Sequence, residues 1–223
     1  MKESPIISNL ISTFEAHRNP TYAAKMKAYM KGRYDFYGIN QPLRKTLAKP
    51  FLKQLLDNPD IRPSDVIHAL WEQPNRELLY VCLEYVALAH KRWTPDILED
   101  FEYMLTHHAW WDTVDLIASN LVGTYFKKWY DADYQRIGVW NNSDNLWLNR
   151  TAIIFQLKYK DKTNIEILFT TIETHRQSKE FFHQKAIGWA LRELAKTKPQ
   201  LVFDYVQYTE LMPLSKREAL KHF

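Results

Sequence analysis

A pattern of helix starts repeats about every 35 residues along this chain, and this repeat constrains the fold more than any other feature of the sequence. Apolar residues follow helical spacing in nearly every segment, without the alternation typical of strands. The predicted starts of six helices are separated by 34, 33, 35, 35 and 37 residues. These starts are Gln41-Pro42, Asn75, His108, Ser143, Ser178 and Ser215. A repeated helical hairpin of this length predicts an all-α fold, an α-solenoid of stacked helical pairs.

The sequence predicts one domain that spans residues 1–223. A second helix fits between successive starts, as at residues 94–105 and 164–175, and no Gly/Ser linker divides the chain. Most of the ten prolines fall where helices begin, as in Ser4-Pro5 and Asn19-Pro20. Pro50 is the exception, and we expect it to kink or end the helix that starts near Gln41.

Composition excludes several classes of protein. The five glycines are scattered, so neither a dinucleotide fingerprint nor a P-loop is expected, and no nucleotide is bound. The eight histidines and the single cysteine show no metal-ligand spacing, so no metal or other cofactor is expected. A lone cysteine favours a reducing compartment. The apolar run at residues 78–89 is too short to span a bilayer, and the N-terminus lacks a secretory signal. We therefore expect a cytoplasmic protein without a membrane partner.

A nucleic-acid-binding surface must here come from the placement of charge, because the net charge is only +4. Asp115, Arg150 and Lys185 are spaced by 35 and 35 residues, so they occupy equivalent positions in three successive repeats. Neighbouring helices pack about 8–10 Å apart, so the three polar heads are predicted to form one row. Arg192, seven residues beyond Lys185, extends the same face.

Two tryptophans share this face. Trp111 lies four residues before Asp115, and Trp189 lies four residues after Lys185. Trp147, between two leucines, is interpreted as a core residue. A carboxylate, cations and indoles on one surface favour a functional site, although a cap or a solvated charge is the alternative for Asp115 alone.

Lys158, Lys160 and Lys162 alternate near the end of a predicted helix. Cations there interact favourably with the helix dipole, so a solvated helix end is the simpler interpretation. Contact with phosphate is the alternative.

Five motifs are more specific than the repeat. They are HAWWDTVD at 108–115, SDNLWLNR at 143–150, FQLKYK at 155–160, KEFFHQKAIGW at 179–189 and PLSKREA at 213–219. Together with YMK at 29–31 and YGIN at 37–40, they closely resemble the AlkD-like family of bacterial DNA alkylation repair glycosylases. The resemblance covers essentially the whole chain, which ends at Phe223, slightly before the short tail that we would expect. It implies HEAT-like helical hairpin repeats with a concave DNA-binding face.

The resemblance assigns roles to residues one by one. It implies that Asp115 is the catalytic carboxylate and that Trp111 and Trp189 are the paired tryptophans of the active site. It implies that Arg150 contacts a DNA phosphate.

Further candidates for DNA contact lie on both sides of that site in the sequence. Tyr29 matches a DNA-facing tyrosine of the family, and the following loop carries Asn40, where a relative has glutamine. Lys185, Arg192 and Lys158 complete the predicted nucleic-acid-binding residues.

The function implied by the resemblance is that of a monomeric DNA glycosylase of base excision repair, acting on double-stranded DNA that contains alkylated bases. Alkylation at N3 or N7 makes a purine cationic and a good leaving group, so hydrolysis of the N-glycosidic bond needs no general acid. A carboxylate stabilises the positive charge that develops on the sugar, and indole faces attract a cationic base. The family is thought to act on a lesion that stays largely within the helix. The alternative is a non-catalytic HEAT-like repeat module that binds DNA structure or a protein partner.

Overall fold

The computed structural model describes residues 4–129 and 134–223, and the regular secondary structure of these residues is entirely helical. Extended pairing in the described ranges is limited to an isolated bridge between Asp35 and Asn75. No described helix is long and apolar enough to cross a membrane. Internal contacts group the chain into two compact units that divide between Asp100 and Phe101. Each unit is described by itself, and the single domain expected from sequence stays a prediction.

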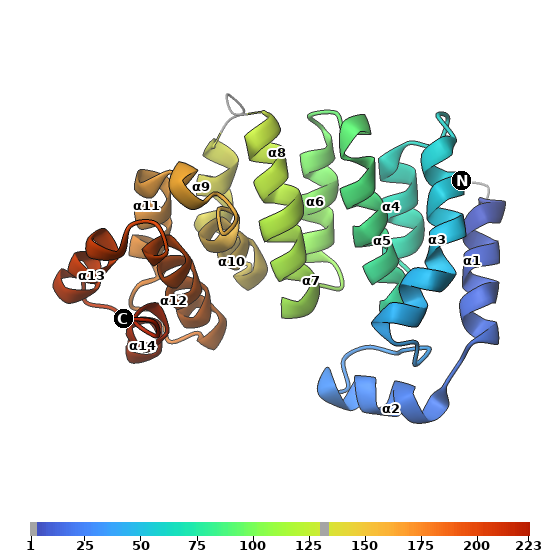
Figure 1. The fold of residues 1–223 in the computed structure, drawn as a ribbon, viewed down its shortest axis with the longest axis horizontal. Helices are drawn as coiled ribbons and strands as arrows, with labels where there is room; N and C mark the ends of the chain where they lie inside the picture. Colours follow the sequence, from blue (N-terminus) through green and yellow to red (C-terminus); the bar gives the residue numbers. More distant parts are fainter. Residues whose placement is uncertain (1–3, 130–133) are drawn as a thin grey trace. The chain divides into compact units, whose positions relative to one another are not determined.

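Unit 1 consists of antiparallel helices that pack against their neighbours in the chain. Its helices are α1 (Pro5–Ala16), α2 (Pro20–Tyr29), α3 (Gln41–Asp57), α4 (Pro63–Trp71), α5 (Arg76–Leu88), the 3₁₀ turn η1 (Ala89–Arg92) and the start of α6 (Ile97–Thr106). Helix α3 packs against α1 and α5, and α4 packs against α5, so these helices lie side by side (Figure 1). Helix α2 differs from the others in this unit because it buries none of its residues.

The segment between α2 and α3 is fixed by a buried carboxylate. Glu77 of α5 accepts hydrogen bonds from the backbone N–H groups of Tyr37, Gly38 and Ile39 at 3.1, 2.9 and 3.1 Å. Burial raises the pKa of Glu77, and the three backbone donors oppose that rise. Gly38 has φ +86°, and a Cβ there would lie 2.1 Å from the Asn19 carbonyl oxygen. The YGIN motif thus links α5 to the start of α2.

Unit 2 contains two layers of helices. Its helices are the rest of α6, α7 (Trp111–Leu116), the π-helical turn η2 (Ile117–Val122), α8 (Gly123–Lys128), α9 (Gln135–Asn141), α10 (Leu146–Ile154), the 3₁₀ turn η3 (Lys160–Lys162), α11 (Ile165–His175), α12 (Phe181–Ala195), α13 (Pro199–Tyr208) and α14 (Pro213–Ala219). Helix α10 packs against α7 and α12, and α12 packs against α14, to form one layer. Helices α9, α11 and α13 pack behind this layer (Figure 1). The all-α fold of stacked helical pairs is confirmed within each unit.

The repeat is more regular in the structure than in the predicted starts. Helices α3, α5, α7, α10 and α12 begin at residues 41, 76, 111, 146 and 181, each 35 residues after the last. Helix α14 begins at residue 213. The period that the sequence predicts is therefore confirmed, whereas most of the individual caps are not.

Four of the predicted helix starts are wrong by two or three residues. His108 has φ 52°, and α7 begins three residues later. Ser143 and Ser178 lie two residues before the N-caps of α10 and α12, and each hydroxyl accepts the N–H of the residue two positions on. Ser215 is buried inside α14, where its hydroxyl donates to the Gln184 carbonyl at 3.2 Å. Serine hydroxyls make both kinds of local contact, so sequence alone did not separate a cap from a turn.

Prolines mark helix starts as predicted, with one difference. Pro5, Pro20 and Pro199 open α1, α2 and α13. Pro50 lies inside α3, which continues to Asp57, so the expectation that it could end this helix is wrong.

Candidate functional site

Asp115 lies on α7 in unit 2, at the boundary between the core and solvent. Val114 and Ile117 are fully buried and fix the inward face of this helix. The Asp115 side chain is 19% exposed. The Ser119 hydroxyl donates to the Asp115 main-chain carbonyl at 2.7 Å. The carboxylate is thus held on an ordered helix while part of it still reaches solvent.

The helix that carries Asp115 contains a π-helical turn. Helix α7 continues through η2 into α8 without a break. Close packing follows this turn, because a Cβ on Gly123 would lie 2.5 Å from the Phe155 carbonyl oxygen. The Tyr159 hydroxyl donates to the Gly123 carbonyl at 2.8 Å. Such turns frequently occur at functional sites, and the sequence analysis did not detect this one.

Arg150 forms a bidentate ion pair with the Asp115 carboxylate. Its Nε donates to Oδ1 at 2.7 Å and its Nη2 donates to Oδ2 at 3.0 Å. Its Nη1 donates to the Phe182 main-chain carbonyl at 2.7 Å. The Arg150 side chain is only 5% exposed. Helices α7, α10 and α12 are therefore joined through one guanidinium.

The pair agrees with the spacing argument but changes the role expected of Arg150. The 35-residue spacing predicts that Asp115 and Arg150 are neighbours, and the structure brings them together. The family resemblance assigns the Arg150 fork to a phosphate, whereas three of its N–H donors here face protein oxygens. Arg150 in this arrangement orients Asp115, and contact with phosphate stays a prediction.

An aromatic cluster lies beside this pair. The ring of Trp110 is 5.3 Å from that of Trp147 and 5.5 Å from that of Phe182, and the last two rings are 4.9 Å apart. The Arg150 guanidinium carbon is 5.8 Å from the centre of the Phe182 ring. These three aromatic residues are half-buried at the first turns of α7, α10 and α12. Trp147 is thus part of a surface cluster, so its interpretation as a core residue is wrong.

Trp111 and Trp189 are each half-buried, as expected for indoles of a recognition surface. Trp111 is the first residue of α7, one turn before Asp115. Trp189 is on α12 and packs in part against the apolar core of unit 2. Both side chains therefore combine contact with the protein and exposure to solvent.

Lys185 and Arg192 both bind Glu218 of α14. Lys185 Nζ is 3.0 Å from Oε1, and Arg192 Nη1 is 2.8 Å from Oε2. Arg192 also donates to the Glu218 main-chain carbonyl at 2.8 Å. Hydrogen bonding from Lys185, followed by that from Arg192, lowers the pKa of Glu218. Gly188 permits this approach, because its added Cβ would lie 2.4 Å from the Glu218 Cβ.

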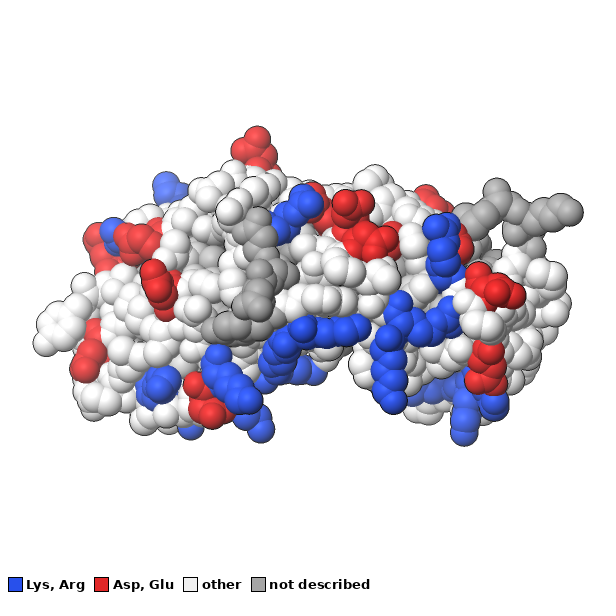
Figure 2. Space-filling view, turned by 90° about the horizontal axis from the view of Figure 1, so that it is seen from above, with Lys and Arg blue, Asp and Glu red and all other residues white. Residues whose placement is uncertain are grey.

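Lys158 lies on a basic surface close to the helix of Asp115. Its ammonium contacts the Asn120 side-chain oxygen. Asn120 is five residues after Asp115 and lies in η2, the π-helical turn that follows α7. Lys127 Nζ donates to the Lys158 carbonyl, and burial followed by the charge of Lys162 lowers the pKa of Lys127. Figure 2 shows Lys and Arg side chains in blue on one face of the molecule, with Asp and Glu side chains in red among them.

The buried His183 and the half-buried His175 form a pair near Arg150. The rings of His175 and His183 are 4.3 Å apart. Burial, followed by the charges of His175 and Arg150, lowers the pKa of His183 to about 4. The Ser178 hydroxyl lies 2.8 Å from His183 Nδ1. Near neutral pH this ring is therefore uncharged and adds no repulsion to the Arg150 guanidinium.

Tyr29 and Asn40 belong to unit 1. Tyr29 ends α2 and is 69% exposed. Asn40 is the N-cap of α3, where its side chain accepts the Leu43 N–H at 3.0 Å. The cap accounts for this asparagine structurally, and its contact with DNA stays a prediction.

Comparison with known proteins decides the family. The chain matches the family described as DNA alkylation repair enzyme over residues 10–223. It is also similar to a solved structure from Enterococcus faecalis, a predicted DNA alkylation repair enzyme, with 34% sequence identity and a TM-score of 0.86. This match covers 92% of the present chain and 96% of the other. The chain belongs to the DNA alkylation repair enzyme family.

The fold of this DNA alkylation repair enzyme also occurs in a solved structure of much lower sequence identity. The structure of smu.31 from Streptococcus mutans UA159 is similar with a TM-score of 0.61 and 16% identity, over 82% of this chain and 96% of that one. No curated protein matches the sequence. The family match confirms the resemblance found in the motifs and supports an enzyme that acts in repair of alkylation damage in DNA.

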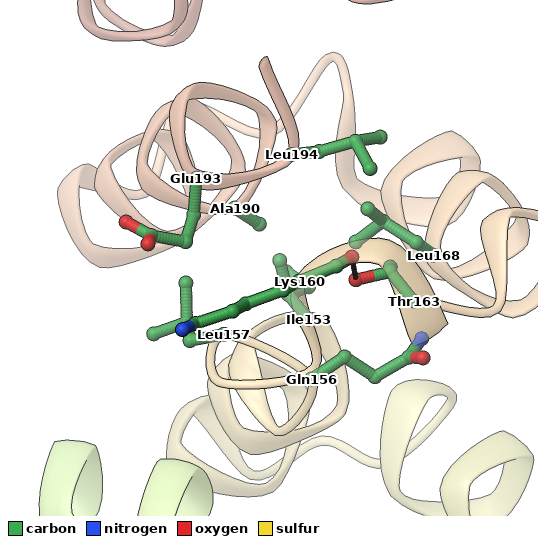
Figure 3. Close-up of a pocket in the computed structure, with 9 residues that line it drawn as sticks. All are labelled: Ile153, Gln156, Leu157, Lys160, Thr163, Leu168, Ala190, Glu193 and Leu194. Atoms are coloured by element: carbon green, nitrogen blue, oxygen red, sulfur yellow. Dashed lines mark hydrogen bonds between the residues drawn. The ribbon is translucent and has the colours of Figure 1, made fainter. Parts of the chain in front are cut away.

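A small cavity behind the site of this repair enzyme is not a base-binding pocket. It lies between the end of α10 and α12, with Leu157, Ala190 and Leu194 around it and Lys160 across it (Figure 3). Its volume of about 10 Å³ suffices for one water molecule at most. The Thr163 hydroxyl donates to the Lys160 carbonyl at 2.8 Å at its edge. This cavity is therefore too small to hold a nucleobase.

Sequence reasoning missed several contributors to this site. Phe182 supplies both the carbonyl that binds Arg150 and a ring of the aromatic cluster. Glu218 binds two of the predicted DNA-contacting cations. The 35-residue spacing from Trp147 to Phe182 was a signal for the first, and nothing local marked Glu218. Among the described residues, no group of three His, Cys, Asp or Glu side chains could hold a metal ion.

Proposed function

We propose that this protein is a DNA glycosylase that hydrolyses the N-glycosidic bond of N3- and N7-alkylated purines and leaves an abasic site. The observation that carries the proposal is the state of the Asp115 carboxylate. It is partly exposed, and the buried Arg150 donates a hydrogen bond to each of its two oxygens. A preorganised charge of this kind stabilises a cationic transition state without reorganising during the reaction.

The reaction balances without a cofactor. The C1′–N bond breaks, and its electron pair leaves with the alkylated purine, which becomes neutral. The sugar develops oxocarbenium character, and the Asp115 carboxylate stabilises that charge. A water molecule attacks C1′ and loses its proton to Asp115 or to solvent. Arg150 keeps the carboxylate oriented through its two contacts with Oδ1 and Oδ2.

The half-buried indoles can attract the positive charge of an alkylated purine. Trp111 and Trp189 expose part of each ring, and an aromatic face attracts a cation by about 0.5–2 kcal/mol. This attraction disappears when the base leaves as a neutral molecule. Recognition by the tryptophans would therefore favour alkylated over ordinary purines.

Positive side chains supply sequence-independent contacts with the duplex. Lys158 is exposed, and Lys185 and Arg192 are partly exposed and paired with Glu218. A phosphate can replace or join that carboxylate, so we propose that all three cations of unit 2 contact DNA. We propose the same role for Tyr29 and Asn40 of unit 1. Double-stranded DNA containing alkylated bases is the proposed substrate, and a monomer is the proposed active form.

One observation favours the alternative of a non-catalytic module that binds DNA structure or a protein. Asp115 and Arg150 satisfy each other fully in the fork, as a purely structural ion pair would. Release of free base decides between the two functions.

The test is release of N3-methyladenine and N7-methylguanine from methylated duplex DNA under single-turnover conditions. Asp115→Asn is expected to slow release by about 10²–10³-fold and to preserve or improve DNA affinity, because a negative charge near phosphate is removed. Asp144→Asn, at an exposed position of the same unit, is the matched control and should act like the native protein. Binding of methylated DNA by the native protein without release of base would favour the non-catalytic alternative.

A further inference from the structure

The apolar face of α2 lines an open groove. Tyr22, Met26, Tyr29 and Met30 follow one another at the spacing of a single helical face, and all four line the hollow. An apolar helical stripe normally packs on a core, yet α2 buries none of its residues. The hollow has a volume of about 330 Å³. The stripe therefore faces space that the described part of unit 1 leaves unfilled.

The groove has a buried floor and exposed aromatic walls. Met30 and Phe36 form the floor, with exposed fractions of 5% and 7%. Tyr22 and Tyr29 form the walls, with exposed fractions of 40% and 69%. The Tyr80 ring also lines the groove, and it has the Arg44 guanidinium 4.8 Å from its centre.

The segment that follows α2 is fixed against α5 and against the start of α2. Glu77 binds three successive backbone N–H groups of that segment, and Gly38 lets it approach Asn19. The Asn19 N–H in turn donates to the Tyr37 carbonyl at 2.9 Å, at the start of α2. The start of α2 is thus tied to the segment that follows the helix.

Charge around the groove favours an anionic partner. Lys25 lines it and is exposed, and Lys31 and Arg33 follow on the exposed surface beyond α2. Between residues 20 and 40 the only acidic residue is Asp35, which pairs with Lys27 at 2.7 Å. An uncharged apolar ligand would form no ion pair with these cations.

We propose that this groove binds one unstacked nucleobase of bound DNA against the aromatic side chains that line it, Tyr22 and Tyr29 of α2, with Lys25 on the adjoining phosphate. A base is flat, apolar on both faces and attached to an anion, which matches aromatic walls beside a cation. The volume is at the lower end of the range for small-ligand sites, about 300–1,000 Å³, and suits a single nucleotide. The inference rests on the proposed binding of DNA but not on glycosylase chemistry.

Binding of undamaged oligonucleotides tests the groove without any base release. We compare a duplex that carries one unpaired nucleotide with the same duplex fully paired. The native protein should bind the bulged duplex about tenfold more tightly, as expected for one base stacked on tyrosine. Tyr29→Ala and Tyr22→Ala should lose this preference, and Tyr29→Phe should keep it because the ring and not the hydroxyl is required. Tyr208→Ala, at a 90% exposed tyrosine of α13, is the matched control and should keep the preference.

A fluorescent base identifies the contact. With 2-aminopurine as the unpaired nucleotide, binding should quench its fluorescence through stacking, and Tyr29→Ala should remove the quenching. Lys25→Ala should weaken binding of the bulged duplex more than that of the paired duplex, since the phosphate that Lys25 contacts adjoins the unstacked base. Equal affinity of the native protein for the two duplexes, or a preference that survives both tyrosine-to-alanine changes, would overturn the proposal. Loss of base release by itself would overturn only the glycosylase proposal, because these DNAs carry no lesion.

Discussion

Replacing Arg150 by lysine keeps the positive charge but removes the planar fork that holds Asp115. Arg150 makes two parallel contacts with the carboxylate, at 2.7 and 3.0 Å, and a third with the Phe182 carbonyl at 2.7 Å. A lysine ammonium is a single point charge and cannot reproduce all three. The Asp115 carboxylate then keeps a cation nearby but loses its fixed orientation.

The magnitude follows from the exposure of the two side chains. Arg150 is 5% exposed and Asp115 is 19% exposed, so water can replace the lost donors only in part. We expect Arg150→Lys to lower the free energy of unfolding by about 1–2 kcal/mol, the cost of one or two lost hydrogen bonds. Arg150→Ala should cost about 3 kcal/mol, since it leaves a carboxylate without its buried partner. Misorientation of Asp115 should slow base release about 10- to 100-fold in Arg150→Lys.

Chemical denaturation and single-turnover base release measure the two effects separately. A double-mutant cycle with Asp115→Asn should give a coupling energy of at least about 1 kcal/mol in stability, because the residues share one hydrogen-bonded pair. In base release, Arg150→Lys should have little further effect once Asp115 is replaced. Additive losses in both measurements, or a native rate of release in Arg150→Lys, would refute the view that Arg150 acts by positioning Asp115.

Three further tests concern the surrounding surface. Lys158→Ala should reduce the slope of log affinity against log salt concentration by about one unit in DNA-binding titrations, and an unchanged slope would remove this lysine from the phosphate contacts. Trp111→Ala and Trp189→Ala should lose release of cationic purines while costing less stability than Trp71→Ala, which removes a fully buried indole at about 3–5 kcal/mol; equal costs in thermal melts would make them core residues. The pKa of Glu218 is lowered in the folded protein, so its stabilisation is present above its ordinary pKa of 4.5 and is lost as pH falls through the lowered value. Glu218→Gln should therefore flatten the acid dependence of the unfolding free energy, and an unaltered acid profile would contradict the ion pairs seen here.

The aromatic residues show what helical periodicity predicts about the site and what it does not predict. Their spacing placed Trp111 one turn from Asp115, and it is half-buried there as expected. The same reasoning made Trp147 a core residue because leucines flank it. In the structure, its ring instead packs against Trp110 and Phe182, which come from the first turns of two other helices. Neighbours along the chain are thus a weak guide to burial at helix ends, where residues from adjacent repeats meet.

The sequence by itself determined the helices, their 35-residue period and the adjacency of Asp115 and Arg150. These features depend on local propensity and on repetition of one packing unit, so spacing along the chain suffices to predict them. Only the tertiary structure decided that the Arg150 fork closes on Asp115 and Phe182, that Glu218 binds Lys185 and Arg192, and that a π-helical turn follows Asp115. The physical reason is that a hydrogen-bond partner is chosen by the close approach of helices distant in sequence. At Gly123 and Gly188 that approach depends on the absence of a single Cβ.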